Sequence, residues 1–126
     1  MDQIVRGWSM GGYGALLAAE IAHDVFGSVC AVSPALWTNA ADQERAVPDA
    51  FDGEADFDAN NVFRGANTLR RVRIACGTKD PFYRASTEFV ATLREHGNPP
   101  ETEFAVGFHD DAFWRLTATD NFSFFF

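Results

Sequence analysis

The apolar residues of this 126-residue chain follow two recurring patterns. Short, nearly continuous apolar runs bounded by glycine or proline are typical of strands that are buried on both faces. Longer segments carry apolar residues three or four positions apart, which is the spacing of one face of a helix. The predicted strands are 3–7, 27–33, 72–76 and 102–106, and the predicted helices are 10–23, 82–96 and one that begins at Ala112.

Turn and capping residues agree with these boundaries. Pro81 suits the first turn of the second helix, and Gly97 follows its end. Asp110 or Asp111 can cap the last helix, because a carboxylate there accepts from the free N–H groups of the first turn. Segment 38–60 is polar and acidic, and we predict a surface excursion that contains a short helix.

Strands and helices alternate along the chain, and this order predicts an α/β fold. Apolar strands in such an order form a parallel sheet, here of about four strands, with helices on its faces. The length suits a single domain, 1–126. In open parallel sheets, ligands bind at the carboxyl ends of the strands. Ser9, Asp80 and His109 follow the first, third and fourth predicted strands and are therefore the candidate functional residues.

Composition excludes several kinds of partner. The formal net charge of −8, with scattered basic residues, argues against nucleic acid and anionic membrane surfaces. We interpret the one basic cluster, 70–73, as the polar entry to a strand. No apolar run has the length of a membrane span. Cys30 and Cys76 sit inside apolar runs and are predicted to be buried free thiols, and no metal or cofactor site is expected.

The turn around Ser9 has the pattern G-x-S-x-G, formed by Gly7-Trp8-Ser9-Met10-Gly11. This pattern is the nucleophile elbow, a strained strand-to-helix turn that exposes the serine hydroxyl. The residues two before and two after the serine are expected to be small, so that strand and helix can approach each other. The N–H of Met10 is the expected oxyanion donor. The alternative is a glycine-rich turn without chemistry.

A serine nucleophile needs a base, and the base needs an orienting carboxylate. His23 and His96 lie at predicted helix ends, which leaves His109 as the candidate base, although a surface-loop histidine is the alternative. Asp80 is the candidate carboxylate, because Asp110 and its neighbour are too close to His109 in sequence and fit better as helix caps. Asp80 could instead cap the helix that follows it. The order Ser, Asp, His is typical of α/β-hydrolases.

Four segments together resemble the esterase D and S-formylglutathione hydrolase-like family of α/β-hydrolases, which includes the bacterial mycolyltransferases. The motifs are G-x-S-M-G-G-x-G-A at 7–15, S-P-x-x-W at 33–37, G-x-x-D-x-F at 77–82 and H-D-x-x-x-W at 109–114. The resemblance implies hydrolysis of a carboxyl ester or thioester, a small-molecule substrate, through an acyl-enzyme. It implies Ser9 as nucleophile, His109 as base and Asp80 as the residue that orients the base.

The chain departs from the family pattern in two places. Phe108 stands where the family usually has glycine before the histidine. The chain also begins almost at the nucleophile strand, so we expect the C-terminal part of an α/β-hydrolase fold. The preceding part would supply the second oxyanion N–H, and without it a strand edge would be open for association.

These departures leave alternatives open. One is a catalytically incompetent remnant of such an esterase, and another is an acyltransferase of the mycolyltransferase kind. A serine peptidase of the prolyl-oligopeptidase kind shares G-W-S-x-G-G but fits the His109 loop less well. Residues 1–3 lack the basic start of a secretory signal, and the compartment is left unassigned.

Overall fold

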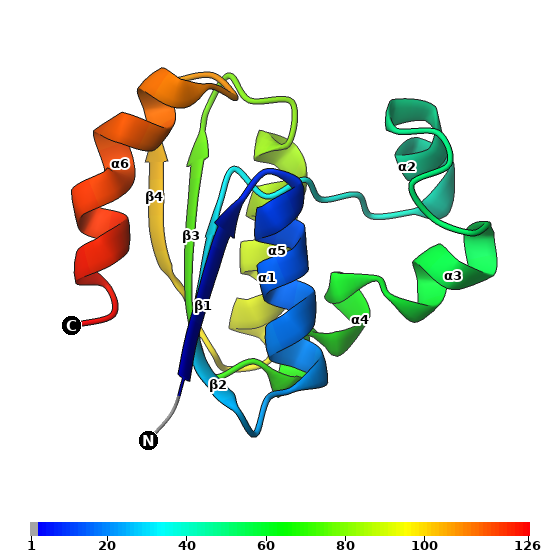
Figure 1. The fold of residues 1–126 in the computed structure, drawn as a ribbon, viewed down its shortest axis with the longest axis horizontal. Coiled ribbons are helices and arrows are strands. Elements are labelled where there is room, and N and C mark those ends of the chain that lie inside the picture. Colours follow the sequence, from blue (N-terminus) through cyan, green and yellow to red (C-terminus); the bar gives the residue numbers. More distant parts are fainter. Residues whose placement is uncertain (1–2) are drawn as a thin grey trace.

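A computed structural model describes residues 3–126 as a four-stranded parallel sheet with helices on both faces (Figure 1). The strands lie side by side in their order along the chain, and each neighbouring pair is parallel. The α/β class and the partial α/β-hydrolase sheet are therefore confirmed. The strands are β1 Gln3–Trp8, β2 Phe26–Val32, β3 Arg71–Gly77 and β4 Glu101–Ala105. The prediction about a secretory start falls partly on residues 1–2, which lie outside the described residues.

The helices form one layer on each face of the sheet. Helices α1 (Met10–Ile21) and α5 (Tyr83–Glu95) cover one face, and α6 (Asp111–Ser123) covers the other (Figure 1). Right-handed crossovers between parallel strands place helices on the faces in this way. The turn before α1 and the loops before α5 and α6 lie at the same edge of the sheet, where the strands end.

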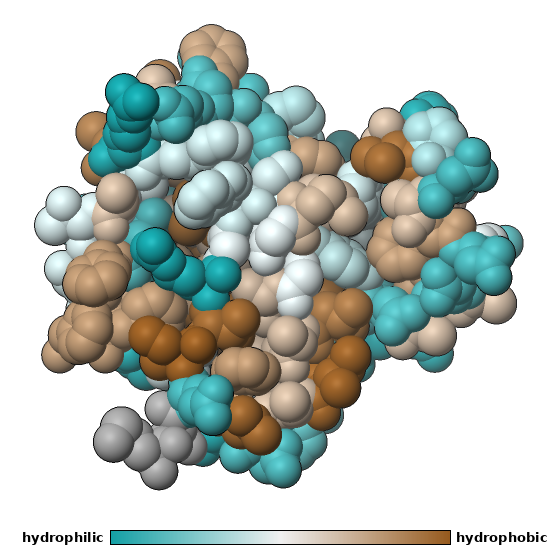
Figure 2. Space-filling view, in the orientation of Figure 1, coloured by the Kyte–Doolittle hydropathy of each residue, from teal (hydrophilic) through white to brown (hydrophobic). Residues whose placement is uncertain are grey.

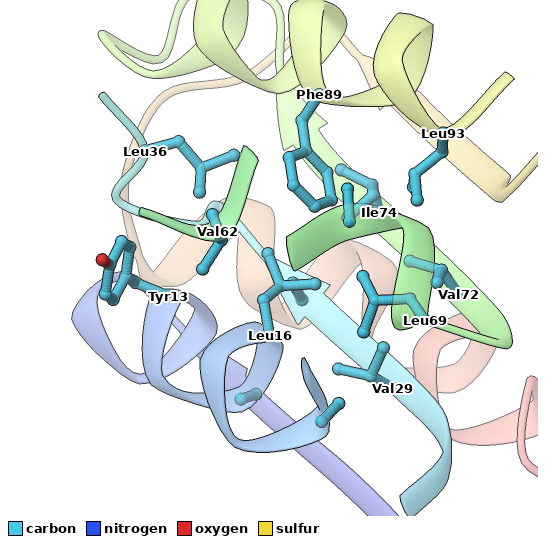
Figure 3. Packing of buried hydrophobic residues seen from close by; sticks show 14 of the residues in the cluster. Tyr13, Leu16, Val29, Leu36, Val62, Leu69, Val72, Ile74, Phe89 and Leu93 are labelled. Carbon is cyan, nitrogen blue, oxygen red and sulfur yellow. The ribbon is translucent and has the colours of Figure 1, made fainter. Parts of the chain in front are cut away.

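The main core lies between the sheet and the layer of α1 and α5 (Figure 3). Leu16 of α1, Ile74 of β3 and Phe89 of α5 are completely buried there. Alternate residues of β2 point to opposite faces of the sheet. Val29 and Ala31 therefore join this core, whereas Cys30 and Val32 pack on the other face, toward α6. Burial on both faces explains the nearly continuous apolar run of this strand.

The polar excursion is longer and more helical than predicted. It contains α2 (Ala40–Ala46), α3 (Glu54–Ala59), α4 (Val62–Gly65) and a 3-10 helix (Ala66–Thr68). Asn39 and Asn61 cap α2 and α4 by accepting from backbone N–H groups. Each short helix buries a single side chain, Gln43 in α2, Phe57 in α3 and Val62 in α4. One buried residue gives too weak a periodic pattern to predict a helix.

The interpretation of 70–73 as a polar strand entry is wrong for Arg73. This residue lies inside β3 and is only 3% exposed. Its guanidinium donates to Asn121 at 2.9 Å and forms ion pairs with Glu101 and Glu103 of the adjacent strand. Burial lowers the pKa of Arg73, but the bonds to Glu103 and Glu101 outweigh that effect and raise it above its ordinary value. Its partners, distant along the chain, make this burial possible.

Strand β1 is an edge strand of the described sheet, and its side chains are largely exposed. Figure 2 shows an apolar area over the lower part of β1 and α1, next to the aromatic end of α6. Exposed apolar side chains near this edge include Ile4, Ile21, Val25, Phe122 and Phe126. Association through this edge stays a prediction. No helix within residues 3–126 is long and apolar enough to cross a membrane.

Candidate active site

The three candidate residues lie together at the carboxyl edge of the sheet. The Ser9 Oγ lies 2.8 Å from Nε2 of His109, and the Nδ1 of His109 lies 2.7 Å from Oδ2 of Asp80. An ionised carboxylate only accepts, so Nδ1–H donates to Asp80 and Nε2 accepts from the Ser9 hydroxyl. The His109 side chain is 24% exposed and that of Asp80 is completely buried. In this arrangement, Nε2 of His109 can accept the proton of the Ser9 hydroxyl.

The turn at Ser9 has an unusual backbone conformation. Ser9 adopts φ 57° and ψ −127°, which is strained for a residue with a side chain. Its N–H donates to the carbonyl of Val32, and its own carbonyl accepts from Gly12, Tyr13 and Ala35 at 2.9–3.2 Å. These bonds fix the turn from both the helix and the end of β2.

The requirement for small residues around Ser9 is confirmed at Gly7 and wrong at Gly11. A Cβ on Gly7 would lie 2.2 Å from the carbonyl oxygen of Gly11, so strand and helix touch there through backbone atoms. A Cβ on Gly11 would meet no described atom within 4 Å apart from its chain neighbours and the backbone of its own helix. The carbonyl of Gly11 faces the strand, whereas its Cα faces outward, and only the first glycine is sterically required.

Met10 is the first residue of α1 and follows Ser9 directly. The N–H groups at a helix start carry partial positive charge and have no acceptor within the helix. Such a donor next to the hydroxyl can stabilise negative charge that develops on a bound acyl oxygen.

Asp80 contacts both His109 and the turn before α5, although α5 itself has no side-chain cap. Its Oδ2 contacts His109, while its Oδ1 accepts from the backbone N–H of Phe82 at 2.8 Å, just before α5 begins. The loop is also fixed by Lys79, whose N–H donates to the carbonyl of Gly107 at 2.9 Å. The Asp80 and His109 loops are therefore held to each other by backbone as well as side-chain contacts.

The other histidines and carboxylates have structural positions. Asp110 caps α6 by accepting from the N–H of Phe113 at 3.1 Å, and Asp111 pairs with Arg115 on the same helix. His96 is the C-terminal cap of α5, and His23 lies in the turn after α1. The assignment of these groups to helix ends is confirmed.

Sequence reasoning missed the aromatic surroundings of His109. Phe82 and Trp114 each meet the imidazole edge-on, with ring centroids 5.5 and 5.6 Å away. The indole N–H of Trp114 donates to the Ser33 hydroxyl at 3.1 Å. Phe108 is 58% exposed, so the side chain that departs from the family pattern points away from the packed loop. The aromatic residues of the motifs at 33–37 and 109–114 could have indicated these surroundings, but a sequence pattern does not show which rings are in contact.

The two thiols are free and buried, as predicted, and neither is suited to act as a nucleophile. Burial raises the pKa of Cys30 to about 11 and that of Cys76 to about 12. A thiolate, not a thiol, attacks carbonyl carbon, so both groups are inert near neutral pH. In the part of the chain that the structure describes, no cluster of three or more His, Cys, Asp or Glu side chains could hold a metal ion.

Several solved structures share this fold. An S-formylglutathione hydrolase (FrmB) of Staphylococcus aureus matches with a TM-score of 0.71 and 23% identity, over 96% of this chain and 50% of that one. The S. aureus fluorophosphonate-binding serine hydrolase FphF matches with a TM-score of 0.72 and 20% identity, over 97% and 52%. A capsule O-acetyltransferase of Neisseria meningitidis serogroup A matches with a TM-score of 0.69 and 18% identity, over 92% and 54%.

The chain therefore spans about half the length of these structures. No curated protein matches its sequence. A family model described as "Putative esterase" matches residues 2–122. Because that match extends over nearly the whole chain, the protein belongs to this esterase family.

Proposed function

We propose that this site hydrolyses a carboxyl ester or thioester through a covalent acyl-enzyme. The observation that carries the proposal is the unbroken row of hydrogen bonds from Asp80 through His109 to Ser9. Each member has the chemistry of its role: a hydroxyl as nucleophile, an imidazole as base and a buried carboxylate that orients the imidazole. The membership in an esterase family supports the same reaction.

The reaction proceeds in two halves. Ser9 Oγ attacks the carbonyl carbon of the substrate while Nε2 of His109 takes the hydroxyl proton. The resulting oxyanion is stabilised by the N–H of Met10 at the start of α1. His109 then returns the proton to the leaving oxygen or sulfur, and the acyl group stays on Ser9. A water molecule attacks the acyl-enzyme in the same manner, with His109 again as base, and releases the acid.

Acyl transfer is the second candidate. An acceptor alcohol can replace water in the second half of the reaction without any change in the roles of Ser9 and His109. The observation that favours it is the structural match to a capsule O-acetyltransferase, which has the same fold as the described chain. Product analysis of an aryl ester in the presence of added alcohols separates the two: hydrolysis yields the free acid and transfer yields a new ester.

Covalent labelling with a fluorophosphonate probe tests the proposal. We expect the folded 126-residue chain to gain the phosphonyl group, which is the mass of the probe less HF, and Ser9→Ala to gain none. Ser123→Ala, which removes a hydroxyl at the end of α6, is the matched control and should label like the parent chain. Circular dichroism and a cooperative thermal transition establish that each sample is folded. Absence of labelling in a folded parent chain would show that this chain alone is not an active serine esterase.

A further inference from the structure

The segment 33–37, which follows β2, is buried next to the candidate site. All of its residues are buried, and Ser33 is wholly inaccessible. Ser33 has φ 46°, a left-handed conformation that a residue with a side chain keeps only where its surroundings fix it. Its N–H donates to the carbonyl of Ala75 at 2.7 Å. The proposed chemistry gives this strained turn no role.

One end of the segment reaches His109 through Trp114. The Ser33 hydroxyl accepts from the Trp114 indole N–H at 3.1 Å, and this bond fixes the rotation of the indole. The indole in turn meets the imidazole at an interplanar angle of 82°. Trp8, the residue before Ser9, stacks on the same indole with ring centroids 5.9 Å apart.

The other end of the segment reaches His109 through Phe82. Trp37 meets the Phe82 ring edge-on, at 5.4 Å between centroids and 87° between planes. Phe82 meets the imidazole at 5.5 Å and 64°. Edge-to-face contacts of this kind are favourable beyond the area that they bury. Both rings that border His109 are thus fixed by residues of the same five-residue segment.

The hydrogen bond to Asp80 alone does not hold the imidazole in place. A bond at Nδ1 fixes one atom of the ring, whereas the ring can still turn about that bond and move Nε2 away from Ser9. Two rings with fixed orientations remove this freedom. The same segment also supports the nucleophile, because the N–H of Ala35 donates to the Ser9 carbonyl at 3.0 Å.

We propose that Ser33 and Trp37 are positioning residues, which act through Trp114 and Phe82 to hold the His109 ring so that Nε2 faces Ser9. We call these four residues the His109 clamp. The clamp deepens the proposed function and rests on it. In this proposal the buried segment 33–37 positions both Ser9 and His109, the two residues joined by the 2.8 Å contact.

Two variants that break the same hydrogen bond test the first arm of the clamp. Ser33→Ala removes the acceptor, and Trp114→Phe removes the donor but keeps an aromatic ring. We expect each to slow fluorophosphonate labelling of Ser9 by about three- to tenfold, the effect of losing one neutral hydrogen bond. The double variant should be no slower than the slower single variant, because both changes remove one interaction.

A spectroscopic measurement tests the clamp without any reaction at Ser9. The ring protons of His109 lie beside two aromatic rings, so their NMR resonances report the orientation of the imidazole. We expect these resonances to move in Ser33→Ala and in Trp37→Leu, because both variants keep the two rings beside His109 and a shift then reports the orientation of the imidazole. Thr117→Ala is the matched control, because it deletes a buried hydroxyl on the helix of Trp114 without contact to His109.

The outcomes separate failure of the clamp from failure of the proposed function. Unchanged His109 resonances in Ser33→Ala and Trp37→Leu, or equal changes in Thr117→Ala, would overturn the clamp even if Ser9 is labelled. The clamp would also be overturned if the loss of labelling rate in the double variant equalled the product of the losses in the two single variants. If the parent chain is not labelled at all, the proposed function fails, while the resonances still decide whether Ser33 and Trp37 orient His109.

Discussion

The two ends of α1 differ in whether their buried polar groups have hydrogen-bond partners. At its start, the strained Ser9 has backbone partners on every side, and its carbonyl accepts three N–H groups. At its end, Glu20 is only 8% exposed, and its Oε2 has no hydrogen-bond partner among the described residues. Burial raises the pKa of Glu20 to about 9. At one end the N–H and the carbonyl of Ser9 are thus both paired, and the other end holds a carboxyl group that burial keeps protonated.

The contrast extends to the close contacts at each end. Gly7 faces the backbone oxygen of Gly11, whereas Gly65 of α4 faces the side chain of Glu20. A backbone oxygen inside a helix cannot move without breaking the helix, but a side-chain carboxyl can rotate. The close contact at the start of α1 is therefore between backbone atoms, whereas the one at its end involves a side chain that can rotate.

The largest expected effect comes from removing the charge of the partnered carboxyl group. Asp80→Asn should lower the rate of ester hydrolysis and of Ser9 labelling by about four orders of magnitude, because an amide no longer holds the imidazole in the correct tautomer. Glu20→Gln makes the same chemical change at the other end of α1 and should leave both rates unchanged. Stopped-flow or steady-state assays on an aryl ester measure this. Equal losses in the two variants would contradict the assignment of Asp80.

The second effect concerns the contact between strand and helix. Gly7→Ala places a Cβ 2.2 Å from the Gly11 carbonyl oxygen and should lower the free energy of unfolding by about 3 kcal/mol. Gly14→Ala lies in the same helix, where an added Cβ meets no described atom within 4 Å. It should raise that free energy by about 0.5–1 kcal/mol through helix propensity. Urea denaturation compares the two, and a tolerated Gly7→Ala would show that the close approach is not required.

The third effect is a pH dependence of stability that originates at Glu20. Its pKa in the folded state, about 9, lies above the ordinary value of 4.5. Between these pH values the folded chain retains a proton that the unfolded chain has released, so stability falls as pH rises from about 4.5 to about 9. Glu20→Gln carries no such proton, and its stability relative to the parent chain should increase with pH.

Urea denaturation at pH 5 and pH 8 measures this difference. We expect the free energy of unfolding of Glu20→Gln, relative to the parent chain, to rise by more than about 1 kcal/mol between the two pH values. Glu54→Gln, an exposed carboxyl group in the first turn of α3, is the control and should show no such increase. A constant difference between Glu20→Gln and the parent chain would mean that Glu20 is solvated.

The sequence predicted the strands and the placement of Ser9, Asp80 and His109 because these depend on local patterns. Apolar runs bounded by glycine and proline marked the ends of the four strands to within one residue. Parallel strands bring the residues that follow them to one edge. The geometry between the three side chains could not be predicted, since it depends on how the loops after β3 and β4 hold each other through Gly107.

Buried polar side chains were the main features that the sequence did not reveal. The sequence places Arg73 at the surface until its partners on β4 and α6 are known, and it gives no partner for Glu20, the one charged residue of the otherwise largely apolar α1. The link from Ser33 to Trp114 joins residues 81 positions apart. Such contacts are decided by tertiary packing, and no local pattern marks them.

The smallest expected effect follows from Gly65→Ala at the adjustable end of α1. The new Cβ would lie 2.4 Å from Oε1 of Glu20, and the carboxyl group must turn toward the adjacent cavity of about 400 Å³. There it gains solvent, so the pKa of Glu20 should fall from about 9 and the free energy of unfolding should change by less than about 1 kcal/mol. Gly77→Ala is the counterpart near the site, where the new Cβ would meet the backbone oxygen of Gly107 at 2.3 Å. An NMR titration of the Glu20 carboxyl carbon, together with urea denaturation, compares them. If Gly65→Ala is as costly as Gly77→Ala, the Glu20 carboxyl group cannot turn away, and the contact at the end of α1 is as rigid as a contact between backbone atoms.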